Sequence, residues 1–277
     1  MNDDVLIRLR RVYKVYRVSD TGVVALAGVS LDIPRGEFLA VVGPSGAGKS
    51  TILNLVGGLD RASAGEVEVD GRDLGRLSDR DLTSHRATRV GFVWQGTARN
   101  LIPYLSVRDN VRLPAAVHRG VASGLRREAD ELLGSVDLAD RARHRPGQLS
   151  GGEQQRAAIA VALASTPQVL LADEPTAELD SVSAERTLDA FRAVNREFGV
   201  TIVMVTHDLA AARRADRRIR VRDGRLLTEG TAVDPIGPDG RVRLPDDVVA
   251  ALGGVDLEAE LTEGEAHLRR RSETGHA

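Results

Sequence analysis

The stretch Gly43-Pro44-Ser45-Gly46-Ala47-Gly48-Lys49-Ser50 decides the fold of this chain, because it fits the phosphate-binding pattern G-x-x-x-x-G-K-[ST]. The apolar run 38–42 before it predicts a buried strand, and residues 51–56 after it predict the beginning of a helix. Glycines allow such a loop to turn tightly and to present backbone N–H groups to phosphate oxygens. This strand–loop–helix context predicts a nucleotide-binding core of the α/β class.

Within the loop, we expect Lys49 to reach the β- and γ-phosphates and the hydroxyl of Ser50 to ligate Mg²⁺, with Thr51 also in the nucleotide-binding set. The chain has 38 basic residues, of which only Lys14 and Lys49 are lysine. A compact ammonium fits beside phosphates where a planar guanidinium does not. The lysine therefore favours a triphosphate site over a glycine-rich turn that carries Lys-Ser by chance.

Composition limits the possible classes of protein. The 277 residues, 42% of them hydrophobic, suit one large domain or one large domain with an appendage. The net charge of −2 gives no general sign of nucleic-acid binding, and the lack of cysteine excludes disulfides and thiolate metal sites. No apolar run approaches the roughly 20 residues of a membrane helix, and the first residues show no signal-peptide pattern. We expect a soluble protein that another chain would hold at any membrane.

Two kinds of strand pattern are present. Residues 5–18 alternate apolar residues with arginine, as in an antiparallel edge strand, and residues 23–33 predict one or two further strands. Later apolar runs predict buried strands that alternate with helices, which favours a mainly parallel sheet. Helical periodicity dominates from about residue 96 to residue 164. Segments 217–222 and 225–227 predict a hairpin around Asp223-Gly224.

A second element of the phosphate site is the run Val169-Leu170-Leu171-Ala172-Asp173-Glu174. A carboxylate at the end of a buried strand, such as Asp173, can hold Mg²⁺ through water. Glu174 can accept a proton from an attacking water molecule. The alternative is an ordinary strand followed by a polar turn, but the position about 120 residues after the glycine-rich loop favours the catalytic interpretation.

A third element is the stretch Leu149-Ser150-Gly151-Gly152-Glu153-Gln154-Gln155-Arg156. A serine at a helix N-cap followed by two glycines predicts a second anion-binding helix terminus. One chain does not need two phosphate cradles for one nucleotide, so we expect this one to serve a nucleotide held by another copy. The alternative is a plain capping box between Ser150 and Glu153, which explains the helix start but not the two glycines.

With these three elements the sequence resembles the ATPase subunits of ABC transporters, over about residues 5–228. The stretch LSGGEQQR matches the signature of that family, and further motifs follow the family's order. The resemblance implies a P-loop NTPase core with a mainly parallel sheet, an antiparallel β-subdomain and a helical subdomain. It also implies that Ser150, Gly151, Gly152 and Glu153 act on the nucleotide of a second, identical subunit.

The resemblance assigns roles to four more residues. Gln95 is similar to the family glutamine that touches Mg²⁺ or the attacking water and couples to the transmembrane partner. His207 is similar to the switch histidine, whose imidazole can reach a γ-phosphate. Asp180 is the firmest member of a D-loop at 177–180, which begins with Ala177 where serine or glycine is common. Tyr16 is at the position of the aromatic residue that stacks on adenine, with Tyr13 as the alternative.

Segments 57–60, 91–95 and 110–114 are similar to the lipoprotein-release, macrolide-export and cell-division group of these ATPases. The resemblance implies ATP and Mg²⁺ as cofactors, an integral-membrane permease as partner, export as the direction, and a peripheral position on the cytoplasmic side of the membrane. A non-transport ABC ATPase is one alternative, but its usual coiled-coil insert or second cassette is not in the sequence. A nucleotide-dependent regulator with a DNA-reading tail is the other.

We expect an ATP-binding domain at 1–229, with its helical subdomain at about 96–164, and a linker with an accessory domain at 230–277. The second part resembles the swapped-hairpin fold of AbrB-type regulators, with strands at 241–244, 257–261 and 266–270 and a short helix at 246–252. From Pro235 onward it carries nine acidic residues and five arginines, a net charge of −4. This charge argues against DNA binding. We expect a β-rich dimerisation element, with a flexible tail as the alternative.

Overall fold

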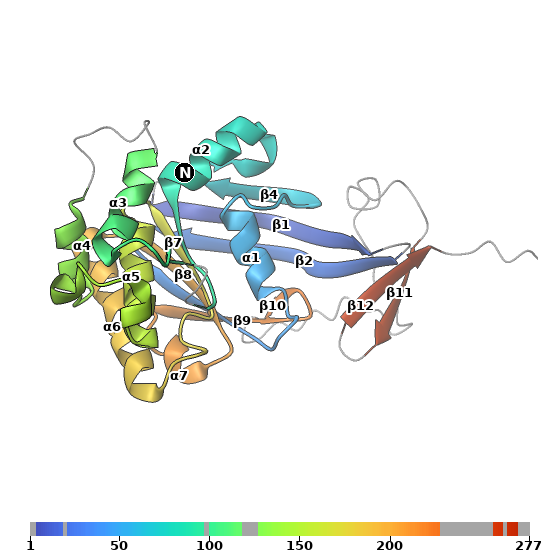
Figure 1. Cartoon of the computed structure of the whole chain (residues 1–277). Coiled ribbons are helices and arrows are strands. Elements are labelled where there is room, and N and C mark those ends of the chain that lie inside the picture. Colours follow the sequence, from blue (N-terminus) through green and yellow to red (C-terminus); the bar gives the residue numbers. More distant parts are fainter. Residues whose placement is uncertain are drawn as a thin grey trace, which may run out of the picture.

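The computed structural model describes residues 4–18, 21–96, 100–117, 127–227, 257–262 and 265–270. They contain two six-stranded sheets, and α3, α4, α5 and α6 gather at the end of the molecule remote from β11 and β12 (Figure 1). Among the described residues, no helix combines the length and the apolar character that crossing a lipid bilayer requires.

The first sheet is mainly parallel, as the sequence predicts. Its strand order is β10-β9-β3-β8-β7-β6, and only β10 runs antiparallel to its neighbour. The strands are β3 (Phe38–Val42), β6 (Val90–Val93), β7 (Val169–Asp173), β8 (Thr201–Thr206), β9 (Arg217–Arg222) and β10 (Arg225–Leu227).

Both faces of this sheet are covered. Alternate residues of β3 belong to two different hydrophobic clusters: Phe38, Ala40 and Val42 face one, and Leu39 and Val41 face the other. The first cluster includes α5 and α6, and the second includes α1 and the antiparallel sheet. A strand buried on both faces has no polar side, which explains its uninterrupted apolar sequence.

The second sheet is antiparallel, in the order β11-β12-β2-β1-β4-β5. Its strands are β1 (Val5–Val18), β2 (Thr21–Pro34), β4 (Ala64–Val69), β5 (Arg72–Asp73), β11 (Leu257–Thr262) and β12 (Glu265–Arg270). The prediction of an edge strand at 5–18 is wrong, because β1 lies between β2 and β4. Arg8 donates to Glu68 of β4, and Arg10 donates to Asp32 of β2. The arginines of β1 therefore form ion pairs with both neighbouring strands.

The helices are α1 (Lys49–Val56), α2 (Asp79–Arg89), α3 (Val107–Val117), α4 (Ala129–Ser135), α5 (Gly151–Leu163), α6 (Ser181–Phe198) and α7 (Leu209–Ala212). Single 3-10 turns are η1 (Leu74–Arg76), η3 (Ala139–Arg141) and η4 (Pro146–Gln148). The ends of helix α6 follow from local chemistry, since Asp180 caps its first turn and Gly199 ends it at a φ of 64°.

The two strands predicted at 257–261 and 266–270 are confirmed as β11 and β12. β11 and β12 are antiparallel, and β12 also pairs with β2, with His267 opposite Val23. The tail strand predicted at 241–244 and the helix predicted at 246–252 lie outside the described residues.

Candidate nucleotide-binding and catalytic site

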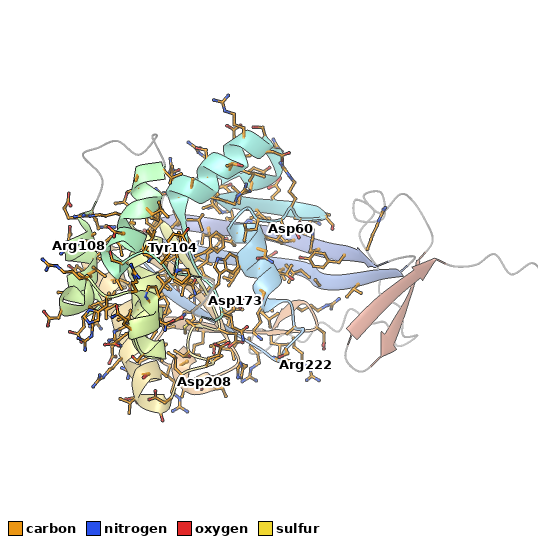
Figure 2. All side chains as sticks on the ribbon, viewed as in Figure 1. Asp60, Tyr104, Arg108, Asp173, Asp208 and Arg222 are labelled. Carbon is orange, nitrogen blue, oxygen red and sulfur yellow. The ribbon has the colours of Figure 1, made fainter. Side chains whose placement is uncertain are left out.

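The predicted site residues follow the carboxyl ends of four adjacent parallel strands. Gly43 follows β3, His207 follows β8, Glu174 follows β7, and Gln95 comes two residues after β6. Since the spatial order is β3-β8-β7-β6, these segments lie side by side along one edge of the sheet. Asp173 and Asp208 are labelled at this edge in Figure 2. The carboxyl edge of a parallel sheet is where ligands bind in such folds.

The glycine-rich loop is held against two other segments. A Cβ on Gly43 would lie 2.2 Å from the carbonyl oxygen of Val221 in β9, and one on Gly48 would lie 2.3 Å from that of Ala25 in β2. Gly46 and Gly48 adopt positive φ angles of 79° and 95°. Close packing therefore requires glycine at both 43 and 48, and the positive φ of Gly48 also favours glycine there.

The Lys49 side chain is only 7% exposed, and the loop surrounds it with oxygens. Its Nζ donates to the carbonyl oxygens of Gly43 at 2.8 Å and Pro44 at 2.9 Å, and lies 3.6 Å from Oε1 of Glu174. A buried ammonium is costly unless it is paired. The arrangement keeps one positive charge at the edge of the sheet, where phosphates of a nucleotide would bind.

Ser50 and Asp173, which the sequence predicts as Mg²⁺ ligands, lie next to each other in the structure. The Ser50 hydroxyl donates to Oδ1 of Asp173 at 3.2 Å, across 123 residues of sequence. Burial raises the pKa of the Asp173 carboxyl above its ordinary value, the charge of Glu174 adds to this, and Ser50 and Lys49 oppose it. Hydroxyl and carboxylate oxygens are ligands that Mg²⁺ prefers.

The described residues contain no group of three or more histidine, cysteine or acidic side chains placed to share a metal ion. A cation held by Ser50 and Asp173 would therefore gain no further histidine, cysteine or acidic ligand from these residues, and water and phosphate oxygens would supply most of its remaining coordination. This fits Mg²⁺, which is usually bound by one or two protein ligands together with a nucleotide.

Glu174 connects the lysine to the histidine. Its Oε2 lies 2.9 Å from Nδ1 of His207 and accepts from the His207 backbone N–H at 3.3 Å, while its Oε1 faces Lys49. The side chain of Glu174 is 12% exposed, and that of His207 is 62% exposed. Glu174 also has a positive φ of 45°, an uncommon conformation for a residue with a Cβ, and such conformations cluster at functional sites. These contacts fix the Glu174 carboxylate between the side chains of Lys49 and His207.

Tyr16 lies near the first turn of α1. Its hydroxyl donates to Oδ2 of Asp60 at 2.9 Å and also forms a hydrogen bond with the side chain of Thr51. Lys14 lies 4.7 Å from the centre of the Tyr16 ring, and its Nζ donates to Oδ1 of Asp60 at 2.6 Å. Tyr13, the alternative, packs instead against Gly28 of β2. Sequence reasoning missed Lys14 and Asp60, although Lys14 is one of only two lysines.

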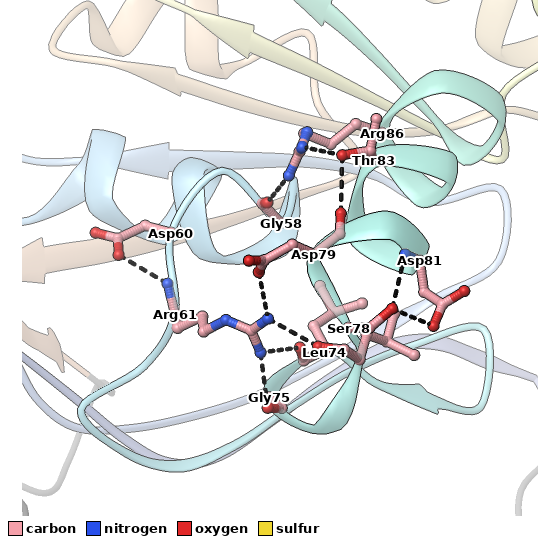
Figure 3. Close-up of polar contacts among 11 residues, drawn as sticks. Gly58, Asp60, Arg61, Leu74, Gly75, Ser78, Asp79, Asp81, Thr83 and Arg86 are labelled. Atoms are coloured by element: carbon pink, nitrogen blue, oxygen red, sulfur yellow. Dashed lines mark hydrogen bonds and ion pairs between the residues drawn. The ribbon is translucent and has the colours of Figure 1, made fainter.

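The segment that carries Asp60 is anchored by two arginines (Figure 3). Arg61 donates to the carbonyl of Gly75 at 2.8 Å and to Asp79 at 3.0 Å, and Arg86 of α2 donates to the carbonyl of Gly58 at 2.7 Å. Burial acts to raise the pKa of the Asp60 carboxyl, but hydrogen bonds from Lys14, the Arg61 backbone and Tyr16 outweigh it and hold the pKa below its ordinary value. Asp60 is thus a fixed anion beside the tyrosine.

The signature stretch forms the capping box that was the alternative interpretation of this sequence. Ser150 Oγ accepts from the backbone N–H of Glu153 at 3.2 Å, and Glu153 accepts from that of Ser150 at 2.8 Å. A Cβ on Gly152 would lie 2.8 Å from Cβ of Ser183 in α6. Close packing against α6 therefore also accounts for the presence of glycine at position 152. Asp180, expected in the D-loop, accepts from the backbone N–H groups of Val182 and Ser183 as the cap of α6. Among the described residues, no hydrogen bond joins Ser150 to the glycine-rich loop.

Comparison with known proteins finds the same family by a family model and by individual relatives. Residues 26–177 match the family model described as ABC transporter. The chain is 45% identical over 228 residues to the ABC transporter ATP-binding protein MJ0796 of Methanocaldococcus jannaschii, covering 81% of this chain and 96% of that protein. It is 41% identical over 248 residues to the macrolide export ATP-binding/permease protein MacB of Brucella melitensis, covering 90% of this chain but only 38% of MacB.

A solved structure is similar over the same region. The dimeric post-hydrolysis state of the ATP-binding cassette MJ0796, bound to ADP and Pi, superimposes with a TM-score of 0.70 at 43% identity. The match covers 80% of this chain and 97% of that one.

Proposed function

The chain belongs to the ABC transporter family of ATP-binding proteins, and from this premise we propose that it is the ATP-hydrolysing subunit of an exporter that drives a separate integral-membrane permease. The observation that carries the proposal is the contact of Glu174 with both Lys49 and His207 at the sheet edge beside Ser50 and Asp173. MacB supports the direction, since its name joins export with an ATP-binding part and a permease.

In the proposed reaction, ATP supplies the phosphoryl bond that water cleaves, and Mg²⁺ offsets the developing charge. The backbone of residues 43–48 and the ammonium of Lys49 bind the phosphates, with Ser50 and Thr51 at the start of α1. Ser50 and Asp173 would hold the cation, and Gln95 would contact it or the attacking water. Glu174 accepts the proton of that water, and His207 keeps the carboxylate oriented through its 2.9 Å contact.

We further propose that two copies form the active unit. Ser150, Gly151, Gly152 and Glu153 of one copy would face the nucleotide of the other, with Asp180 at the same interface. The MJ0796 cassette, which is dimeric with ADP and Pi bound, supports a dimer of the chain. Replacing Ser150 with aspartate tests it, because aspartate still caps a helix but places a negative charge beside the partner's phosphates. We expect unchanged ATP affinity of the monomer and loss of the ATP-dependent dimer. An equal loss of monomer affinity would contradict action across the interface.

One experiment tests both the permease partner and the membrane location of the chain. As a peripheral subunit on the cytoplasmic side, a tagged chain should sediment with membranes and co-purify with a polytopic membrane protein. Recovery from the soluble fraction without such a protein would favour a non-transport ABC ATPase or a nucleotide-dependent regulator. An ATPase rate that rises when the permease is added back would support the motor role.

We propose that residues 1–229 are the ATP-binding domain, with its helical subdomain at about 96–164, and that 230–277 are a linker and an accessory dimerisation element of AbrB-like fold. The β11–β12 hairpin supports a β-rich appendage. Truncation at about Glu229 should weaken dimerisation or ATPase activity. An unchanged dimer with unchanged activity would contradict this role.

A further inference from the structure

Gln95 lies between two residues whose backbones are bound by one side chain. The amide of Asn100 accepts from the N–H of Trp94 at 2.8 Å, and it donates to the carbonyl oxygens of Trp94 at 2.9 Å and Gly96 at 3.1 Å. Asparagine alone among short side chains offers a donor and an acceptor in one plane. The Asn100 amide therefore holds the backbone on both sides of Gln95.

A second asparagine holds the segment that carries Asn100. Asn110, on α3 and 3% exposed, accepts from the N–H of Ile102 at 2.7 Å and donates to its carbonyl oxygen at 3.1 Å. The same amide donates to the carbonyl oxygen of Ser106 at 3.0 Å. Helix α3 is therefore linked to Gln95 through two successive contacts, each between an asparagine amide and the backbone.

The start of α3 is in turn joined to the segment before the signature stretch. The backbone N–H groups of Val107 and Arg108 donate to the carbonyl oxygens of His144 at 2.8 Å and Ala142 at 2.9 Å. These two acceptors lie between η3 and η4, a few residues before Ser150. A displacement of the signature segment would thus be transmitted to α3 and from there to the backbone around Gln95.

We propose that Asn100 is a positioning residue for Gln95, held in place by Asn110, and that it couples Gln95 to the segment before Ser150. The proposal rests on the role given above to Gln95 at the cation or the attacking water. Asn100 acts through the backbone of Trp94 and Gly96 and does not itself need to reach the nucleotide.

The position of Trp94 gives a direct readout, because it is the only tryptophan of the chain. It is half-buried and stacks on Phe92, with ring centres 4.8 Å apart and planes 2° apart. Its fluorescence and its quenching by acrylamide report the order of this segment without any nucleotide. Asn100→Ala removes all three hydrogen bonds of the Asn100 side chain. Asn100→Asp keeps the oxygen that accepts from Trp94 but removes the two hydrogen bonds that the amide donates.

Asn195 provides a matched control. Its amide also bridges two backbone groups, donating to the carbonyl oxygens of Gly36 and Val200 at 2.8 Å each. Both carbonyls precede β3 and β8, at the edge of the sheet opposite Gln95. Asn195→Ala should lower thermal stability but leave Trp94 quenching and the catalytic rate per folded molecule unchanged.

We expect Asn100→Ala to increase acrylamide quenching of Trp94 about twofold and to lower kcat about tenfold to a hundredfold, with KM for ATP changed less than about twofold. In a Gln95→Ala background the same substitution should change kcat less than about twofold. Asn100→Asp should resemble Asn100→Ala, since it lacks the donated bonds.

Unchanged quenching in Asn100→Ala would overturn the proposed contact, and an equal loss of kcat with and without Gln95 would overturn its action through Gln95. A wild-type rate for Gln95→Ala alone would refute the role proposed for Gln95, and with it the catalytic meaning of the contact. Quenching distinguishes these failures, because it does not depend on ATP hydrolysis.

Discussion

Replacement of Glu174 by glutamine separates proton transfer from nucleotide binding. The amide keeps the shape of the side chain and a partner for His207, which lies 2.9 Å away, but it cannot take a proton from water. General-base catalysis contributes about 10²- to 10⁴-fold to rate, so we expect kcat to fall by at least about a hundredfold.

The electrostatics predict that ATP binding survives this change. At the observed 3.6 Å, the attraction between Lys49 and Glu174 is about 4–5 kcal/mol at an effective dielectric constant of 20, before desolvation is subtracted. Loss of the charge on Glu174 frees Lys49 for phosphate and removes repulsion of Asp173. Lys49 keeps its bonds to the carbonyls of Gly43 and Pro44, so it is not left unpaired.

The assay is steady-state phosphate release together with size-exclusion chromatography in MgATP. We expect the variant to retain or tighten its KM for ATP and to accumulate as an ATP-bound dimer. Glu185→Gln removes the same charge from an exposed position on α6 and serves as the control. Phosphate release from the Glu174 variant at the wild-type rate would refute the assignment of the general base.

Three further predictions follow from contacts near the site. Lys14→Met removes the cation beside Tyr16, so KM for ATP should rise several-fold while kcat, measured in the same assay, stays within about twofold. His85 is 2% exposed, and burial together with nearby arginines lowers its pKa. The unfolded chain therefore binds a proton that the native state does not, and urea titrations should show stability falling as pH drops below about 6.5. Gly57→Ala would place a Cβ 2.2 Å from Cζ of Phe92, and we expect a loss of about 1–3 kcal/mol in the same titrations; an unchanged midpoint would contradict the packing.

Local chemistry made several elements predictable. Asp180 and Gly199 delimit α6 because a carboxylate satisfies free N–H groups and glycine adopts a positive φ. Ser150 and Glu153 form their capping box for the same local reason. Other features were not predictable, because their partners are far apart in sequence. Lys14 meets Asp60 across 46 residues, and no periodicity in either segment indicates that contact.

The placement of β1 shows the same limit. Its alternation of apolar residues and arginine indicates one covered face and one polar face, but it does not reveal how many neighbours the strand has. Only pairing with both β2 and β4 shows that β1 is internal.

By itself the sequence determined the phosphate-binding loop, the acidic strand end at Asp173 and the signature helix, because each depends on residues close together along the chain. The tertiary structure decided which strand ends are neighbours. The order β3-β8-β7-β6 brings Glu174 into contact with both Lys49 and His207, which lie far from it in sequence. Periodicity and capping act over one or two turns, whereas strand order follows from how the whole chain buries both faces of its sheet.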